Sequence, residues 1–180
     1  PPPQHPPAHP RQLPPTIKSR EAMKAGLGQT LMQTVATERP ECVSLLKVQY
    51  RMNDDIARFS SQMFYGGEIV SAPEVKNRSI LDFDTPITWI DTSGSDFHEN
   101  FIGETYGRIN PAEAELTINT LKNYINEIGK HRVLEENLDI GIISPYKAQV
   151  QLLRRMFRRD SFFKPFKNLV SVNTVDGFQG

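Results

Sequence analysis

The sequence has little cysteine, no net charge and no long hydrophobic run. Among 180 residues there is one cysteine, Cys42, which excludes an internal disulfide framework and a multi-cysteine metal site and fits a reducing compartment. Lys plus Arg and Asp plus Glu both number 21, so the overall charge indicates no particular partner. Apolar stretches such as residues 140–143 are too short to span a membrane, and no basic-then-apolar signal opens the chain. We therefore predict a soluble, cytoplasmic protein with one core, no membrane contact and no metal ligands.

Proline is concentrated at one end of the chain. Eight of the 14 prolines lie within residues 1–15, where fixed φ angles and missing N–H donors oppose both helix and interior strand. We predict that residues 1–10 are a Pro-rich disordered or misread segment. Periodic patterns typical of a folded protein begin after it.

Apolar periodicity predicts four helices and four strands in alternation. The helices are expected at 19–38, capped by Ser19 and weakened by Gly26 and Gly28; after Asn53, ending at Gly66-Gly67; at 111–128, capped by Asn110; and at 147–159. The strands are expected at 43–48, 87–90, 138–144 and 169–175. This order predicts an α/β fold, a parallel sheet with helices on both faces, joined by right-handed crossovers. Residues 66–86 and 92–109 are expected to be irregular loops of functional or variable character.

Polar residues follow each predicted strand. These segments are residues 49–52, 91–94, 144–147 and 174–180. In a parallel sheet, ligands bind beyond the carboxyl ends of the strands, so all four segments are expected at one edge. Their aromatic, guanidinium, hydroxyl and amide groups suit a nucleotide or a nucleic-acid backbone.

Charge is distributed unevenly along the chain. Residues 147–167 contain seven basic side chains and one acid, whereas residues 68–104 contain eight acids and two basic side chains. The basic segment could hold a phosphate backbone. A solvated helix face with positive charge near its C-terminus explains the same pattern, and both interpretations stay open.

Four ordered motifs carry a resemblance to a known family. Gln12-Leu13-Pro14-Pro15-Thr16, Gln49-Tyr50-Arg51-Met52, Ser144-Pro145-Tyr146-Lys147-Ala148-Gln149 and Thr174-Val175-Asp176-Gly177-Phe178-Gln179-Gly180 resemble motif III, motif IV, the Ser/Thr-Pro-Tyr element and motif V of superfamily 1 helicases. The pattern is most similar to the Upf-like branch, with its senataxin and immunoglobulin-mu-binding relatives. The resemblance implies a RecA-like fold of the P-loop NTPase type, with ATP and Mg²⁺ in a cleft between two such domains.

The resemblance also implies a domain organisation. Residues 11–38 resemble a motif III remnant and linking helix, and residues 39–180 resemble a second RecA-like domain truncated after motif V. Ala8-His9-Pro10-Arg11 departs from the family, which has a strand and Gly-Asp-x-x there. No Gly-x-x-x-x-Gly-Lys-Ser/Thr loop or acidic metal-binding motif is present, so the metal ligands are expected in the first RecA-like domain. The fragment alone is expected to be inactive.

The family's site residues transfer to this chain one by one. Arg51 resembles the arginine that meets the γ-phosphate, and Gln12 resembles the motif III glutamine that senses it. Tyr50 would stack on adenine, with Gln49 and Gly180 also at the nucleotide. A surface salt bridge for Arg51 and a loop amide role for Gln12 are the structural alternatives.

Nucleic-acid contacts and coupling fall in the later motifs. The resemblance assigns contact with single-stranded DNA or RNA to Ser144, Pro145, Tyr146, Lys147, Gln149 and Thr174. It assigns coupling between strand movement and the ATP cleft to Asp176 and Gln179. Tyr146 could instead be an ordinary half-buried tyrosine, and Gly177 is expected to permit a turn or to be purely structural. Met52 and Phe178 are expected in the core.

The function implied is that of a C-terminal motor-domain fragment of an ATP-dependent helicase, with 5′-to-3′ polarity implied by the branch. A non-catalytic nucleic-acid-binding α/β module is the alternative from another class. The missing phosphate loop argues against a third, a small-molecule P-loop kinase.

Overall fold

A computed structural model describes residues 17–82, 85–103 and 107–178. The chain divides into two compact units, the first ending at Trp89 and the second beginning at Ile90. This division falls within residues 39–180, which the family resemblance treats as one domain. Each unit is described by itself.

The first unit contains short helices and one parallel strand pair. Ser19 accepts a hydrogen bond from the Ala22 N–H, as predicted for a cap, but the expected helix over 19–38 is interrupted. Gly26 has a φ of 96°, which ends the first segment, and a Thr30 capping box starts the next. The elements are α1 (Arg20–Ala22), η1 (Met23–Leu27), α2 (Leu31–Glu38), η2 (Pro40–Cys42), β1 (Val48–Gln49), α3 (Asp54–Tyr65), β2 (Val70–Ser71) and α4 (Pro73–Lys76).

The α3 helix begins and ends as its sequence predicts. The Asn53 side chain accepts a hydrogen bond from the Asp55 N–H, and Gly66 takes a left-handed conformation with a φ of 61°. The strand predicted at 87–90 was wrong, and the one predicted at 43–48 was misplaced, because β1 begins only at Val48. Residues 43–47 and 87–90 are assigned no strand in the described part of the chain, and Trp89 is 87% exposed. Residues 87–90 have no paired neighbour among the described strands, so no ladder of hydrogen bonds holds them as a strand.

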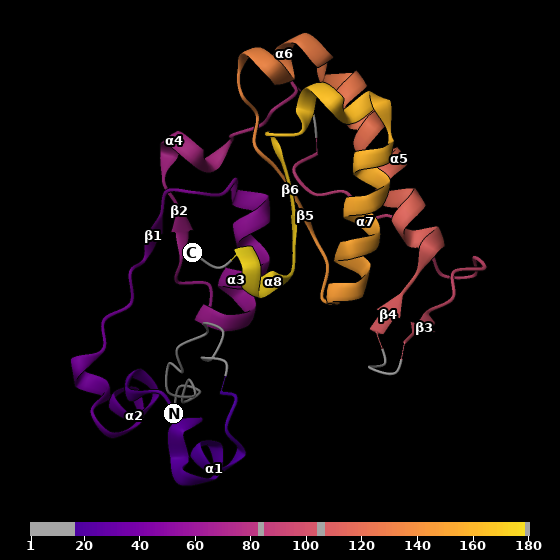
Figure 1. The fold of residues 1–180 in the computed structure, drawn as a ribbon. Helices are drawn as coiled ribbons and strands as arrows, with labels where there is room; N and C mark the ends of the chain where they lie inside the picture. Colours follow the sequence, from indigo (N-terminus) through magenta and orange to yellow (C-terminus); the bar gives the residue numbers. More distant parts are fainter. Residues whose placement is uncertain (1–16, 83–84, 104–106, 179–180) are drawn as a thin grey trace. The chain divides into compact units, whose positions relative to one another are not determined.

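The second unit contains a parallel strand pair, an antiparallel hairpin and the longest helices (Figure 1). Strands β5 (Ile140–Ile143) and β6 (Val170–Asn173) run parallel, and Ile140 lies opposite Val170. Helix α7 (Lys147–Arg159) packs against α5 (Pro111–Ile128), β6 and the hairpin. The remaining elements are β3 (Asn100–Ile102), β4 (Gly107–Ile109), α6 (Lys130–Glu135), η3 (Ser161–Phe166) and α8 (Val175–Phe178).

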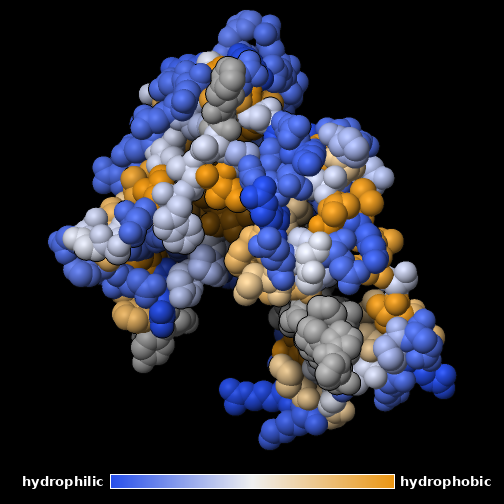
Figure 2. Space-filling model, turned by 180° about the vertical axis from the view of Figure 1, so that it is seen from behind, coloured by the Kyte–Doolittle hydropathy of each residue, from blue (hydrophilic) through white to orange (hydrophobic). Residues whose placement is uncertain are grey.

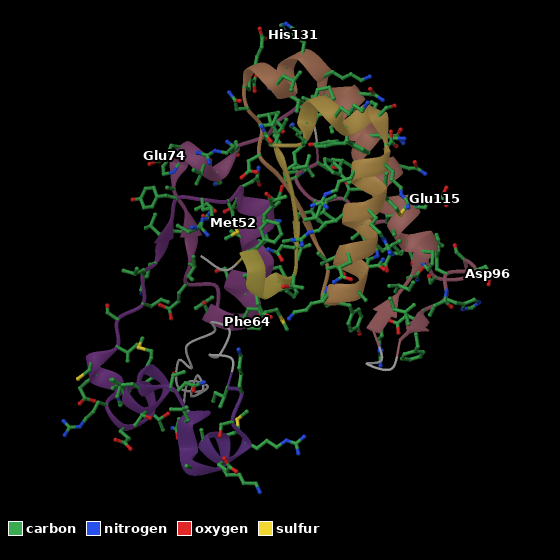
Figure 3. The ribbon with its side chains drawn as sticks, viewed as in Figure 1. Met52, Phe64, Glu74, Asp96, Glu115 and His131 are labelled. Carbon is green, nitrogen blue, oxygen red and sulfur yellow. The ribbon has the colours of Figure 1, made fainter. Side chains whose placement is uncertain are left out.

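Both long helices of this unit confirm their predictions. Asn110 caps α5 by accepting a hydrogen bond from the Glu113 N–H, and α7 spans the predicted residues. The last predicted strand was too long, because Val175 already belongs to α8. Figure 3 shows Glu115 and His131 pointing away from their helices, as expected for the polar faces.

The core of the second unit lies where α5, α7 and η3 meet. The Phe157 and Phe163 rings are stacked with centroids 4.7 Å apart, and Phe163, Phe166 and Ile125 are almost fully buried. Burying each such side chain contributes about 1.5–3 kcal/mol. Large apolar side chains also remain at the surface, visible as orange areas in Figure 2. No helix in the described residues is long and apolar enough to cross a membrane.

The α/β class is confirmed, but the sheet is less continuous than predicted. The strands described form three two-stranded sheets, two of them parallel. The carboxyl ends of all four predicted strands were expected at one edge of a single sheet. Of these, only the ends of β5 and β6 are seen to share an edge.

Candidate nucleotide and nucleic-acid sites

The Gln49 side chain organises the turn after β1. Its Oε1 accepts hydrogen bonds from the backbone N–H groups of Arg51 and Met52, at 2.8 and 2.7 Å. Its Nε2 donates to the Met52 carbonyl and to Ser71 Oγ, both at 2.7 Å. A primary amide has two donors and two acceptor positions, so this amide is fully used within the first unit.

The two residues after Gln49 are presented to solvent. Tyr50 is 65% exposed and Arg51 is exposed. The Arg51 guanidinium makes no hydrogen bond or ion pair with any residue that the structure describes, whereas its carbonyl accepts from Arg78 Nη1 at 3.4 Å. The surface salt bridge considered as an alternative for Arg51 is therefore absent among the described residues. A flat ring and an uncommitted cation side by side suit a nucleotide with its phosphates.

The ends of β5 and β6 bring the later motifs together. The Ser144 N–H donates to the Asn173 carbonyl at 3.2 Å, which extends the strand pairing by one residue. The Thr174 N–H donates to Asn173 Oδ1 at 2.9 Å. Ser144 is buried, and its Oγ accepts from the Tyr146 N–H at 3.5 Å, so its hydroxyl shapes the loop that carries Pro145 and Tyr146.

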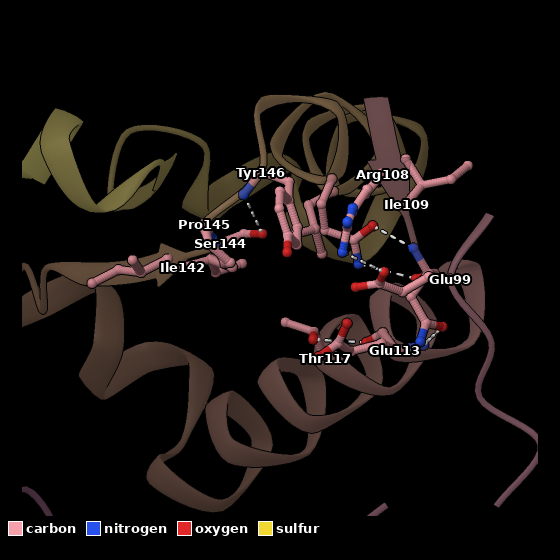
Figure 4. A pocket seen from close by; sticks show the side chains of 13 residues that line it. Glu99, Arg108, Ile109, Glu113, Thr117, Ile142, Ser144, Pro145 and Tyr146 are labelled. Carbon is pink, nitrogen blue, oxygen red and sulfur yellow. Dashed lines mark hydrogen bonds and ion pairs between the residues drawn. The ribbon is translucent and has the colours of Figure 1, made fainter. Parts of the chain in front are cut away.

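A cavity of about 300 Å³ opens beside this loop. Figure 4 shows Tyr146 and Arg108 along one side of it, with Glu113 and Thr117 of α5 on the opposite wall. Arg108 Nη1 pairs with Glu99 Oε2 at 3.1 Å. Tyr146 is 39% exposed, so it is neither a core residue nor a fully solvated one.

Gln149 is buried and hydrogen-bonded to the backbone at the start of another helix. It is 5% exposed, and its amide makes two reciprocal hydrogen bonds with the Asn110 backbone, accepting from N–H at 2.9 Å and donating to C=O at 3.0 Å. In this conformation Gln149 attaches α7 to the start of α5, and it also lines the cavity beside Tyr146. Its contact with nucleic acid stays an untested prediction, for which the amide keeps one further donor and one further acceptor position.

Gly177 is needed for close approach, which corrects the expectation of a special turn. Its φ is not positive. A Cβ at this position would clash with the amide of Asn173, the side chain that accepts a hydrogen bond from the Thr174 N–H. The predictions of core positions for Met52 and Phe178 were wrong: Met52 is half-buried and Phe178 is 38% exposed.

The other predicted residues are exposed or lie outside the described part of the chain. Pro145, Lys147 and Asp176 are exposed, and Thr174 is half-buried. On α7, the Arg154 Nε–H donates to the Val172 carbonyl at 2.9 Å, so this arginine also holds the helix to β6. Gln12, Gln179 and Gly180 are not among the described residues. In the part of the chain that is described, no cluster of three His, Cys, Asp or Glu side chains could hold a metal ion.

Sequence reasoning missed Arg108, Glu99 and Phe101. They lie in residues 92–109, which showed no strong periodicity and were expected to be an irregular loop. The short apolar pair Phe101-Ile102 and the later Arg108-Ile109 flank a turn that contains Gly103, a weak hairpin signal that could have identified them.

The parallel strand pairs, the covering helices and the polar loops at the strand ends define an α/β fold. Residues 27–180 match the AAA domain family, and the chain belongs to it. The comparisons also support the resemblance to Upf-like superfamily 1 helicases. The relatives include DNA polymerase alpha-associated DNA helicase A of Saccharomyces cerevisiae, 32% identical over 94% of this chain and 26% of that protein.

Two further relatives have similar coverage. An uncharacterized ATP-dependent helicase of Methanocaldococcus jannaschii is 30% identical over 94% of this chain and 25% of its own length. DNA-binding protein SMUBP-2 of Mesocricetus auratus is 33% identical over 94% of this chain and 17% of its own length. The chain thus spans about a quarter or less of these relatives.

Proposed function

We propose that this chain acts as the second motor domain of an ATP-dependent helicase. In this role it works with a first RecA-like domain that carries the phosphate loop, and hydrolysis in the cleft between them drives translocation on single-stranded DNA or RNA. The named helicases among the relatives support the proposal.

The observation that carries the proposal is the Gln49-centred turn. It fixes the backbone of Tyr50 and Arg51 while leaving the ring and the guanidinium exposed and uncommitted. Such a pair fits ATP: Tyr50 binds the adenine face, and Arg51 approaches the γ-phosphate. Because its attraction grows as negative charge develops on the transferred group, Arg51 stabilises the transition state more than the bound ground state.

This chain supplies only part of an ATP site. It contains no Gly-x-x-x-x-Gly-Lys-Ser/Thr segment, so the phosphate cradle and the Mg²⁺ ligands belong to the first motor domain. Bound Mg²⁺-ATP supplies the phosphoanhydride bond whose hydrolysis releases the energy for movement. Gln12, Gly180 and Gln179 keep their proposed roles at the γ-phosphate, at the nucleotide and in coupling.

The nucleic-acid side of the proposal rests on the ends of β5 and β6. Ser144 shapes the loop that presents Pro145, Tyr146 and Lys147, and the hydrogen-bonded strand ends place Thr174 beside it. Asp176, two residues further on, is proposed to link this edge to the nucleotide.

ATP hydrolysis assays test the proposal. The chain alone, with excess single-stranded DNA or RNA, should show only background hydrolysis because the cradle and metal ligands are missing. A protein that joins it to a first motor domain should hydrolyse ATP, with stimulation by single strands. Robust hydrolysis by the chain alone that Arg51→Ala removes would contradict the proposal. A joined protein that binds single strands but never hydrolyses ATP would favour the non-catalytic module.

A further inference from the structure

We propose that Phe101, Arg108 and Tyr146 form a stacking platform for the bases of single-stranded nucleic acid. The proposal deepens the proposed function, on which it rests, by assigning base contact to the β3–β4 hairpin, which the motifs leave without a role. Of the three residues, only Tyr146 lies in a recognised motif.

The three side chains come together through the hairpin register and two ring contacts. Phe101 on β3 lies directly opposite Arg108 on β4, so both side chains share one face of the hairpin. The Arg108 Cζ atom lies 5.4 Å from the Phe101 ring centroid and 5.6 Å from the Tyr146 ring centroid. Both distances are within the range of cation–π contacts. The guanidinium therefore bridges two aromatic rings from separate segments.

The hairpin is held against α7 on both sides of Arg108. A Cβ added at Gly107 would lie 3.2 Å from the Ala148 Cβ, so the absence of a side chain lets β4 approach the helix closely. The backbone of Asn110 is fixed by its two hydrogen bonds to Gln149. These two contacts place Arg108 over the loop that carries Tyr146. Contacts within the second unit therefore hold the platform residues in position.

The chemistry of the platform suits bases better than phosphates. Phe101 is 61% exposed and Tyr146 is 39% exposed, so ring surface remains open to a ligand. The Arg108 charge is already paired with Glu99, which reduces its pull on phosphate, and its planar guanidinium holds the two rings together. Every base has a π-face, so stacking on aromatic and guanidinium planes tolerates any sequence. Lys147, the first residue of α7, provides an exposed positive charge beside the platform.

Conservative variants separate stacking from charge and from folding. Phe101→Leu keeps an apolar side chain without a ring, and Arg108→Lys keeps the charge without the plane. The probes are DNA and RNA oligonucleotides of one sequence, with 2-aminopurine as a fluorescent base, and a DNA of equal length made of abasic sites. The matched controls are Phe59→Leu and Arg39→Lys, exposed positions of the same residue types. Circular dichroism establishes that each variant is folded.

The platform predicts that wild-type chain quenches 2-aminopurine in DNA and RNA. Phe101→Leu and Arg108→Lys should weaken binding by about 5-fold or more, while the controls bind as wild type. The slope of affinity against salt should stay unchanged, because no phosphate contact is removed. With the abasic strand, wild type and variants should bind equally.

If Phe101→Leu and Arg108→Lys bind the oligonucleotides as tightly as wild type does, the platform is overturned and the proposed function stands. A wild-type chain that binds no single strand would overturn the platform and the nucleic-acid part of the proposed function, while the ATPase test stands separately.

Discussion

At the level of single residues, the Gln49 amide is the clearest case of a side chain whose role changes once its contacts are known. The resemblance places Gln49 at the nucleotide. The structure gives all four of its hydrogen-bonding positions to Met52, Arg51 and Ser71. We therefore assign Gln49 as a positioning residue within the proposed ATP site, one that acts through the backbone of Arg51.

Gln49→Ala should lower the turnover number of the two-domain protein. Without the amide, the Arg51 N–H and the Met52 carbonyl lose their partners and the turn loosens. A displacement of about 1 Å at a reacting group costs up to about 100-fold in rate. Gln62→Ala, the same substitution at an exposed position on α3, is the matched control and should leave turnover unchanged. Steady-state ATPase kinetics provide the measurement.

A double-mutant cycle separates positioning from a general loss of stability. If Gln49 acts through Arg51, then Gln49→Ala combined with Arg51→Ala should turn over no more slowly than Arg51→Ala alone. Independent, multiplicative losses would refute the positioning role. Thermal melting of each variant reports the structural contribution separately.

At the level of elements, long amphipathic helices could be predicted and short strands could not. The α5 and α7 helices each have an apolar stripe that repeats over several turns, and Asn110 marks the start of α5. The β1 and β2 strands are two residues long, and their pairing depends on partners far away in sequence. Residues 87–90 look like a strand in composition but have no partner among the described strands. Tertiary pairing, which local periodicity does not encode, decides these cases.

One inter-element contact has a defined pH dependence. Asp160, after α7, pairs with Lys122 of α5 and accepts a hydrogen bond from the Phe162 N–H. The Lys122 hydrogen bond, followed by that from Phe162, lowers the pKa of Asp160 below its usual 3.8. A lowered pKa means that the folded state favours the carboxylate. The resulting stability is present above about pH 3.8 and is lost as pH falls through the folded pKa.

Asp160→Asn should therefore lower the melting temperature at pH 6 more than at pH 3. The asparagine cannot form the charged pair, so the gap between wild type and variant should narrow as wild-type Asp160 becomes protonated. Asp176→Asn is the control, because Asp176 is an exposed carboxylate on the short α8 helix. A gap that stays constant from pH 6 to pH 3 would mean that the contact with Lys122 contributes no pH-dependent stability. Thermal melts followed by circular dichroism measure the gap.

At the level of the whole molecule, the proposed chemistry is divided between the two units. Tyr50 and Arg51, proposed for the nucleotide, precede Trp89, whereas Gly180, also proposed for the nucleotide, and the residues proposed for nucleic acid follow Ile90. The motifs were sufficient to predict the family. They could not identify Arg108 or the Gln149–Asn110 contact, because both depend on pairing between segments about forty residues apart.

The most direct test of the central claim compares Arg51→Ala with Tyr50→Ala in a protein that includes the first motor domain. Arg51→Ala should lower the turnover number by on the order of 10²–10⁵-fold, with a much smaller change in nucleotide affinity. Tyr50→Ala should weaken nucleotide binding by about 1–2 kcal/mol, with a smaller effect on turnover. Arg39→Ala, at an exposed ion pair with Glu41, is the control and should match wild type. The measurements are steady-state ATPase kinetics and the binding of a labelled nucleotide. The account predicts that Arg51→Ala mainly lowers turnover and Tyr50→Ala mainly weakens nucleotide binding. The same changes in both variants, or normal turnover in Arg51→Ala, would contradict it.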